Sequence, residues 1–323
     1  MKILVTGGKG FIGSNFILHM MNKYPDYKIV NVDSLTYAAN KDNLKSLESN
    51  ENYVFSQNNI LDAEWLLNVP GKGSDVIVNF AAESHVDNSI EGSRVFIDTN
   101  IVGTQRLLEA AQKNNTRFVQ ASTDEVYGSL GEDDAPFTES SPLDPSSPYS
   151  ASKTSADHLV MAYHKTHGLP TLITRCSNNY GPRQHIEKFI PLFITNCLQG
   201  KDLPLYGTGK NIRDWIYVGD HCAAIDLVLH KGVPGEIYNV GGDCERRNID
   251  IAHIICDATG TDRSKIIPVE DRKGHDWRYA IDHSKITNEL GWKPSAPIEE
   301  QLHKVVEWYR FNESWWNDEY KER

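Results

Sequence analysis

A glycine-rich segment within the first thirteen residues limits what this chain can fold into more than any other feature. The apolar run at residues 2–5 predicts a strand, which leads directly into Thr6-Gly7-Gly8-Lys9-Gly10-Phe11-Ile12-Gly13. Glycines at positions 7, 10 and 13 permit a tight turn and let backbone N–H groups approach a pyrophosphate at a helix N-terminus. The segment therefore predicts the first strand–helix unit of a dinucleotide-binding sheet, with an ordinary glycine-rich turn as the alternative.

Short apolar runs recur through the first half of the chain and predict a sheet. They cover residues 2–5, 28–32, 53–55, 76–80, 118–121 and 171–175. Long helical patterns at 93–114 and 149–167 lie between several of them. Alternation of this kind implies parallel strands covered on both faces. We therefore predict an α/β fold, a Rossmann-type doubly wound parallel sheet with a smaller mixed α/β C-terminal lobe that binds substrate.

The residue pattern changes near residue 178, where the predicted loops become longer and aromatic residues and prolines become frequent. One later segment, 215–241, still has the strand and helix patterns of the first half. We predict that residues 1–177 form a dinucleotide-binding domain and that 215–241 returns to it. The remainder of 178–323 would form a smaller lobe over the carboxyl ends of the strands.

Composition and charge exclude several classes of function. A net charge of -11 over 323 residues argues against nucleic-acid binding and against an anionic membrane surface. No apolar run approaches the roughly 18 residues of a membrane span, and the N-terminus is not a signal peptide. The five cysteines are scattered and lack zinc spacing, which predicts reduced thiols, a cytoplasmic protein and no metal site.

Asp33 ends the predicted second strand, 20 residues after Gly13. This spacing fits a carboxylate that binds the adenosine ribose hydroxyls. Because a carboxylate would repel a 2′-phosphate, Asp33 predicts NAD rather than NADP as the cofactor. A helix cap or turn residue is the alternative interpretation.

Small residues follow the predicted fourth strand and also favour a cofactor there. In Phe80-Ala81-Ala82-Glu83-Ser84 they would let a flat ligand lie against the backbone. Asn100 lies in the middle of the predicted helix 93–114, an unfavourable place for Asn unless its amide has a partner. It is predicted either to bond backbone at the end of the sheet or to face solvent.

Two polar motifs supply the groups for chemistry. Tyr149 and Lys153 are four residues apart and share one face of a helix, where Lys153 would lower the pKa of Tyr149 so that it acts as a base. Thr123-Asp124-Glu125 follows a predicted strand, and one of its adjacent carboxyls should have a raised pKa. An acid, a base and a base at the hydride site indicate an elimination coupled to oxidation. Two surface carboxylates in a turn are the alternative.

Together with the glycine loop and Asp33, these motifs resemble the extended short-chain dehydrogenase/reductase family. The resemblance narrows to dTDP-glucose 4,6-dehydratases and runs from Lys2 to about Trp316. It rests on Ala82-Glu83-Ser84-His85-Val86-Asp87, Ser122-Thr123-Asp124-Glu125-Val126-Tyr127-Gly128, Arg175-Cys176-Ser177-Asn178-Asn179-Tyr180-Gly181-Pro182, Ile212-Arg213-Asp214-Trp215 and Asp271-Arg272-Lys273-Gly274-His275-Asp276. Nucleotide-sugar 4-epimerases of the same superfamily are not built around an Asp-Glu pair at this place.

The resemblance implies a hydro-lyase that converts dTDP-glucose to dTDP-4-keto-6-deoxyglucose and water. Tyr149, aided by Lys153, would be the base on the C4 hydroxyl. Glu125 would take the C5 proton, Asp124 would protonate the leaving C6 hydroxyl, and Thr123 would contact the sugar. NAD would be regenerated in each cycle and stay bound. A UDP-glucose 4,6-dehydratase, a nucleotide-sugar 4-epimerase and a non-enzymatic NAD-sensing protein are the alternatives.

The resemblance also makes 1–177 the NAD-binding domain and 178–323 mainly a nucleotide-sugar-binding lobe, and it assigns binding residues to each. Those for the cofactor are Gly7, Gly10, Phe11, Ile12, Gly13, Asp33, Ser34, Leu35, Thr36, Asn59, Ile60, Phe80, Ala81, Ala82, Ser84, Thr99, Tyr149, Lys153 and Asn179. Those for the substrate are Ser84, Thr123, Asn178, Lys188, Phe189, Pro204, Leu205, Tyr206, Arg213, Asn248, Arg272 and His275. The sequence departs from the family pattern at Asn59, at residues 183–186, and at Lys273 and Trp277. The departures bear on the nucleotide, thymidine or uridine, and leave the catalytic motifs intact.

The two long predicted helices carry apolar residues on more than one face. Leu107, Leu108 and Ala111 fit one face of 93–114, and Leu159, Val160 and Tyr163 fit one face of 149–167. Relatives pair such helices at a two-fold axis, so the resemblance implies a homodimer. Burial of these residues within the monomer is the alternative.

Overall fold

The computed structural model describes residues 1–62, 73–271 and 274–321. A seven-stranded sheet in the order β10-β6-β5-β4-β1-β2-β3 forms its centre, with every neighbouring pair parallel. The strands are β1 (Lys2–Thr6), β2 (Lys28–Asp33), β3 (Tyr53–Gln57), β4 (Val76–Asn79), β5 (Arg117–Thr123), β6 (Thr171–Cys176) and β10 (Ile237–Val240). The predicted doubly wound α/β fold is confirmed.

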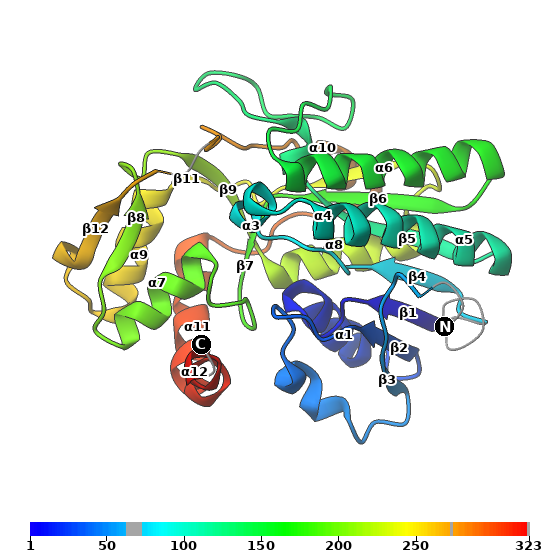
Figure 1. Cartoon of the computed structure of the whole chain (residues 1–323), viewed down its shortest axis with the longest axis horizontal. Coiled ribbons are helices and arrows are strands. Elements are labelled where there is room, and N and C mark those ends of the chain that lie inside the picture. The colour runs from blue at the N-terminus through cyan, green and yellow to red at the C-terminus, as the bar shows by residue number, and fades with distance from the viewer. Residues whose placement is uncertain (63–72, 272–273, 322–323) are drawn as a thin grey trace.

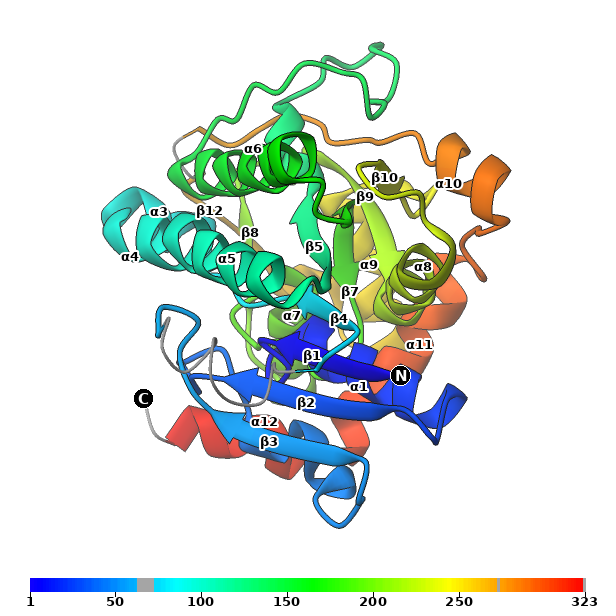
Figure 2. The ribbon, with the colours of Figure 1, turned by 90° about the vertical axis from the view of Figure 1, so that its right-hand side faces the viewer.

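Helices cover both faces of this sheet and make a three-layered lobe, the sheet lobe (Figures 1 and 2). One face carries α1 (Phe11–Lys23), α8 (Val218–Lys231) and α10 (Ser284–Leu290), and the other carries α5 (Thr104–Asn114) and α6 (Pro148–His167). Alternation along β1 builds both cores, since Ile3 and Val5 pack toward α1 and α8 while Leu4 packs toward α5 and α6. Short segments η1 (Lys41–Leu47), α3 (Val86–Glu91) and η3 (Asp124–Tyr127) connect these elements.

The predicted helical stretch 93–114 is present, but it is not α-helical throughout. The structure has α4 (Arg94–Phe96), a π-helical segment η2 (Ile97–Gly103) and then α5. Gly103 lies so close to Ile60 that an added Cβ would come within 2.4 Å of the Ile60 side chain. Single π-helical turns within helices are frequent at functional sites.

The remaining elements form the C-terminal lobe, at the left of Figure 1. It contains α7 (Phe189–Leu198), α9 (Asn248–Thr259), η4 (Arg263–Lys265), α11 (Ile298–Phe311) and α12 (Glu313–Lys321). Its small sheets are β11-β9-β7 and β12-β8, formed by β7 (Asn178–Tyr180), β8 (Leu203–Tyr206), β9 (Ile212–Tyr217), β11 (Glu245–Arg247) and β12 (Ile266–Val269). Ile190, Phe193, Ile251, Leu302 and Trp316 belong to its core.

The helix faces considered for a dimer are largely internal. Leu107, Leu108, Ala111 and Val160 are buried against the sheet, and only Leu159 and Tyr163 are partly exposed. For the buried residues the alternative of burial within the monomer holds, because α5 and α6 use those positions to cover the sheet. No helix within the described residues is long and apolar enough to cross a membrane.

Candidate active site

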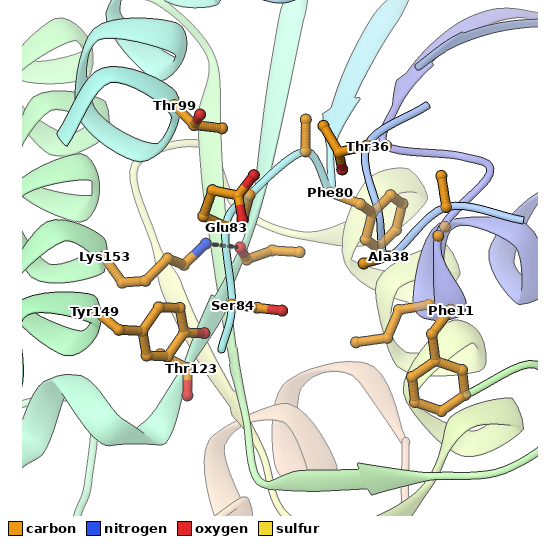
Figure 3. Close-up of a pocket in the computed structure, with 18 of the residues that line it drawn as sticks. Phe11, Thr36, Ala38, Phe80, Glu83, Ser84, Thr99, Thr123, Tyr149 and Lys153 are labelled. Atoms are coloured by element: carbon orange, nitrogen blue, oxygen red, sulfur yellow. Dashed lines mark hydrogen bonds between the residues drawn. The ribbon is translucent and has the colours of Figure 1, made fainter. Parts of the chain in front are cut away.

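A cavity of about 700 Å³ lies at the carboxyl ends of β1, β2, β4, β5 and β6, with walls from both lobes. β1 and β4 are neighbours in the sheet but not in sequence, so the cavity opens where the strand order reverses. This is the place where ligands bind in doubly wound folds. Figure 3 shows Tyr149 and Lys153 on one side of the cavity and Phe11 on the other.

Most of the predicted site residues line this one cavity. From the cofactor set these are Gly7, Gly10, Phe11, Ile12, Gly13, Asp33, Ser34, Thr36, Asn59, Ile60, Phe80, Ala81, Ala82, Ser84, Thr99, Tyr149, Lys153 and Asn179. Thr123, Asp124, Glu125, Asn178 and Lys188 line it as well. The cavity therefore brings together the glycine loop, the Tyr-Lys pair and the Asp-Glu pair.

A second group of predicted residues lies outside the cavity wall. It consists of Leu35, Phe189, Pro204, Leu205, Tyr206, Arg213, Asn248 and His275. Arg272 falls outside the described residues. The Arg213 guanidinium lies over the ring of Tyr279 at 4.4 Å and donates to the carbonyl of Asp276. His275 lies 2.6 Å from a carboxylate oxygen of Asp271.

Close backbone approach explains the glycines of the first loop. Gly7 has a φ of 69°, and a Cβ there would lie 2.6 Å from the backbone nitrogen of Ala81. A Cβ on Gly13 would lie 2.4 Å from the carbonyl oxygen of Gly7. The first turn of α1 therefore approaches the end of β1 closely, and a side chain at either position would fill the cradle.

Asp33 fixes the glycine loop as well as facing the cavity. Its Oδ2 accepts a hydrogen bond from the Lys9 backbone N–H at 2.8 Å, and its Oδ1 accepts one from the Leu35 N–H at 2.8 Å. Burial raises the pKa of Asp33, while these two donors oppose the rise. Each carboxylate oxygen has a further lone pair with which to accept a hydroxyl.

Asn43, a buried residue of η1, connects the glycine loop to the C-terminal lobe. Its Nδ2 donates to the carbonyl of Lys9 at 2.8 Å. Its Oδ1 accepts from the indole N–H of Trp315 in α12 at 2.9 Å, and its carbonyl accepts from Arg183 at 3.3 Å. These hydrogen bonds therefore join the glycine loop of the sheet lobe to the C-terminal lobe.

Tyr149 and Lys153 enter the cavity from the first turns of α6. A capping box between Ser147 and Ser150 begins this helix, with Pro148 in its first turn. Lys153 Nζ donates to the carbonyl of Ala121 at 2.8 Å, and the Thr123 side chain lies beside the Tyr149 ring (Figure 3).

The prediction that Lys153 lowers the pKa of Tyr149 is wrong, because the structure raises that pKa. Burial, followed by the negative charge of Glu125, raises the pKa of Tyr149 well above its ordinary value. Burial also lowers the pKa of Lys153, whose ammonium is hydrogen-bonded to a neutral carbonyl. The phenol is therefore protonated in the described protein, and its use as a base requires added positive charge beside it.

Asp124 has the environment of a protonated acid. It is 2% exposed, and its Oδ2 has no hydrogen-bond partner among the described residues. Burial, and then the charges of Glu125 and Asp214, raise the pKa of Asp124 well above its usual range. Thr123 caps the short helix η3 by accepting from the Glu125 N–H. The prediction that one carboxyl of the pair has a raised pKa is confirmed for Asp124.

The Asn100 side chain bonds backbone at the end of the sheet, as one of the two interpretations of the sequence predicted. Its Oδ1 accepts from the Glu83 N–H at 2.9 Å, and its Nδ2 donates to the Glu83 carbonyl and to Ser152 in α6. The segment after β4 is thereby fastened to the helix that carries Tyr149 and Lys153.

Sequence reasoning missed several residues of the cavity wall, among them Cys176, His221, Glu83 and Glu187. Cys176 ends β6 opposite Thr123, and burial raises the pKa of its thiol to about 12. The rule that parallel strands end at one edge could have found it. His221 comes from α8, is hydrogen-bonded to Asn179 at 2.9 Å, and has its pKa lowered to about 3 by burial. No pattern in the sequence around His221 predicts that it lines the cavity.

Among residues 1–62, 73–271 and 274–321, no group of three or more His, Cys, Asp or Glu side chains is placed to hold a metal ion. All five cysteines are free thiols.

Residues 4–305 match the family described as GDP-mannose 4,6 dehydratase. A dTDP-glucose 4,6-dehydratase of Xanthomonas campestris pv. campestris (strain B100) is 49% identical over 97% of this chain and 94% of its own length. The dTDP-glucose 4,6-dehydratase DesIV from Streptomyces venezuelae, solved with NAD and TYD bound, superimposes with a TM-score of 0.96. It is 49% identical and covers 99% of this chain and 100% of its own. A UDP-glucose 4-epimerase from Thermotoga maritima has a TM-score of 0.89 and 29% identity, over 96% of this chain and 99% of its own.

Proposed function

Since this chain belongs to the GDP-mannose 4,6 dehydratase family, and its relatives at 49% identity are dTDP-glucose 4,6-dehydratases, we infer that it has their activity. It is an NAD-dependent hydro-lyase that converts dTDP-glucose to dTDP-4-keto-6-deoxyglucose and water. The observation that carries this function is the pairing of Asp124, a buried carboxyl whose pKa is raised, with Glu125 in the cavity that also contains Tyr149 and Lys153.

The cavity fits NAD. Its glycine cradle has no room for a Cβ at Gly7 or Gly13, and the Asp33 carboxylate is fixed at the end of β2. We propose that the glycine loop holds the pyrophosphate, Asp33 and its neighbours the adenosine, and Lys153 the nicotinamide ribose. When bound, NAD accepts the hydride of C4, returns it to C6, and supplies the positive charge of its nicotinamide ring near Tyr149.

Oxidation at C4 comes first because it activates the next carbon. Tyr149 removes the proton of the C4 hydroxyl, with Thr123 and Lys153 as its supports. Positive charge close to the phenol lowers its pKa and offsets the effect of burial. The C5 proton of a hexose is not acidic, but a ketone at C4 stabilises the resulting carbanion as an enolate.

Elimination then uses the Asp-Glu pair. Glu125 removes the C5 proton, and Asp124 donates its proton to the C6 hydroxyl as the C6–O bond breaks and water leaves. The raised pKa of Asp124 keeps this proton available near neutral pH. Glu125 finally returns a proton to C5 when C6 is reduced. Tyr149 then releases the proton that it took from the C4 hydroxyl and Asp124 takes one up, through solvent, so that protons and electrons balance over the cycle.

The protonated Asp124 also separates this function from the nearest alternative. A 4-epimerase needs only the Tyr-Lys pair and NAD, since it loses no water and has no use for an acid at C6. The fold alone cannot separate the two reactions, because the UDP-glucose 4-epimerase shares it at a TM-score of 0.89. The buried Asp124 carboxyl therefore supports the dehydratase over the epimerase.

We assign Ser84, Thr123, Asn178 and Lys188 to the sugar and the adjoining phosphates, because all four reach the cavity. Lys188 Nζ lies 3.0 Å from the Ser84 carbonyl, so it is placed beside the sugar end. We assign the nucleoside diphosphate to Phe189, Pro204, Leu205, Tyr206, Arg213, Asn248, Arg272 and His275. Guanidinium groups at 213 and 272 suit phosphate oxygens.

We also propose that the enzyme is a cytoplasmic homodimer. Free thiols at all five cysteines fit a reducing compartment. Ile90, Val95 and Ile97 are each exposed by 44–47% and lie on α3, α4 and η2, beside α5 and α6. A dimer formed through the α3–η2 side would cover these apolar side chains.

The experiment offers purified protein dTDP-glucose and UDP-glucose separately and measures product masses. The proposal predicts that dTDP-glucose loses the mass of one water and gains a C6 methyl group. A product of unchanged mass with inverted configuration at C4 would instead identify an epimerase. Faster water loss from UDP-glucose would overturn the choice of thymidine.

A further inference from the structure

A buried ion pair lies beneath the active-site cavity without lining it. Arg175 Nε lies 2.9 Å from Asp157 Oδ2, and their side chains are 1% and 0% exposed. Removing two charges from water is unfavourable, and their mutual attraction offsets this only in part, so such a pair stabilises the fold weakly. A role in fixing geometry explains its presence better than a role in stability.

Arg175 joins the two elements that carry the chemistry. Asp157 lies on α6, four residues after Lys153 and eight after Tyr149, on the same side of the helix. Arg175 NH1 donates to the hydroxyl of Tyr127 at 2.9 Å, and the guanidinium lies over the Tyr127 ring at 4.8 Å. Tyr127 is the last residue of η3, the short helix that begins with Asp124. One guanidinium therefore connects the Tyr-Lys helix to the Asp-Glu turn.

Tyr127 is held from its other side as well. Its hydroxyl donates to Oδ1 of Asn239 in β10 at 2.8 Å, and its ring stacks on Phe137 at 5.1 Å. This anchoring matters because η3 is a four-residue 3₁₀ helix, whose hydrogen-bond geometry is poorer than that of an α-helix. Residues 128–147, which follow it, contain no helix or strand apart from isolated bridges. β5 fixes the start of this turn at Thr123, but regular structure does little to hold the rest of η3.

The reaction demands a fixed distance between these two elements. Tyr149 acts on the C4 hydroxyl, while Glu125 and Asp124 act on the neighbouring C5 and C6 of the same sugar. A misplacement of about 1 Å in a catalytic group can cost about 10²-fold in rate. One bound sugar can contact both the Tyr-Lys pair on α6 and the Asp-Glu pair on η3 only if the distance between these two elements is kept.

We propose that Arg175 and Tyr127 are positioning residues that hold Asp124 and Glu125 in register with the Tyr149–Lys153 helix. The proposal rests on the proposed function, which assigns the catalytic roles. Neither positioning residue touches the cavity, and each acts through the element to which it is bonded.

The test uses the NAD-loaded enzyme with Tyr127→Phe, which keeps the ring and removes the hydroxyl shared by Arg175 and Asn239. Rapid mixing with dTDP-glucose follows reduced nicotinamide by absorbance and water loss by product mass. We expect reduced nicotinamide to form about as fast as in wild type, since α6 keeps its own contacts. Water loss should slow by about 10-fold to 10²-fold, so that reduced nicotinamide persists.

Tyr238→Phe is the matched control, because it removes a buried tyrosine hydroxyl with two partners elsewhere. That hydroxyl donates to Glu289 and accepts from the Val233 N–H, each at 3.1 Å. It should lower stability to a similar degree without any persistence of reduced nicotinamide. Arg175→Lys is a second test variant, since lysine keeps the charge beside Asp157 but lacks the fork that also reaches Tyr127.

Persistence of reduced nicotinamide in both test variants, but not in the control, supports the proposal. Wild-type water loss in both test variants, or an equal slowing of oxidation and water loss, overturns it. A failure of the proposed function is seen elsewhere: wild-type enzyme itself would neither reduce its NAD nor dehydrate dTDP-glucose. The two failures are therefore distinguished by the protein in which they occur.

Discussion

Replacing Asp124 by Asn tests whether this carboxyl holds a proton in the folded protein. Burial with no partner on Oδ2, together with Glu125 and Asp214, raises the pKa of Asp124 well above its usual range. The folded protein therefore holds a proton that the unfolded chain releases above about pH 4. Because Asn is neutral and nearly isosteric, Asp124→Asn removes a proton donor without removing a charge.

Proton linkage gives the size of the effect on stability. Folded Asp124 binds one more proton than unfolded Asp124 between the ordinary pKa, about 3.9, and its raised value. Its contribution to stability is complete below the ordinary pKa and falls by about 1.4 kcal/mol per pH unit through this window. An Asn side chain does not titrate, so it adds no pH-dependent contribution to the free energy of unfolding. The variant should therefore gain about 1.4 kcal/mol over wild type for each unit of rising pH, while its elimination rate falls about 10²- to 10⁴-fold.

The assay is urea unfolding of both proteins, with equal NAD, between about pH 5 and about pH 7. Asp26→Asn, at an exposed position between α1 and β2, is the matched control for loss of a carboxyl group. Parallel pH dependence in wild type and Asp124→Asn would show that Asp124 is ionised when folded. The account of Asp124 as the acid would then be refuted, as it would be by wild-type water loss in the variant.

Three further results are expected. Tyr149→Phe should lower turnover about 10²- to 10⁴-fold in steady-state assays while NAD stays bound, and near-normal turnover would remove Tyr149 as the base. Glu125→Gln should lose exchange of the C5 hydrogen with deuterated solvent, measured by mass, and continued exchange would assign that proton to another group. Asn43→Ala removes the side-chain bonds to Lys9 and Trp315, so less NAD should remain after purification, with turnover restored by excess NAD. Full retention of NAD, measured after denaturation, would contradict this role for Asn43.

Local patterns predicted the sheet and the cofactor end of the cavity. Apolar strands, the glycine spacing and Asp33 are each readable within a short window, because strand period and turn geometry are local properties. The six predicted strands of the first half are all present in the sheet, and Asp33 lies at the end of β2. The Asp-Glu pair was also found locally, because it directly follows a strand.

Properties set by packing were not predictable in the same way. The π-helical turn η2 forms where Gly103 packs against Ile60 and where Asn100 bonds Glu83. The pKa of Tyr149 depends on how deeply it is buried, which its four-residue spacing from Lys153 does not reveal. His221 joins the cavity from a helix more than 40 residues beyond β6, so only the tertiary fold brings it there.

The central claim is that one enzyme oxidises C4, loses water across C5 and C6, and reduces C6 with the same hydride. dTDP-glucose carrying deuterium at C4 tests it most directly, with the product analysed by mass spectrometry and NMR. We expect loss of one water and deuterium in the C6 methyl group of the product. Loss of the deuterium to solvent, its retention at C4, or a product that keeps its C6 oxygen would contradict the account.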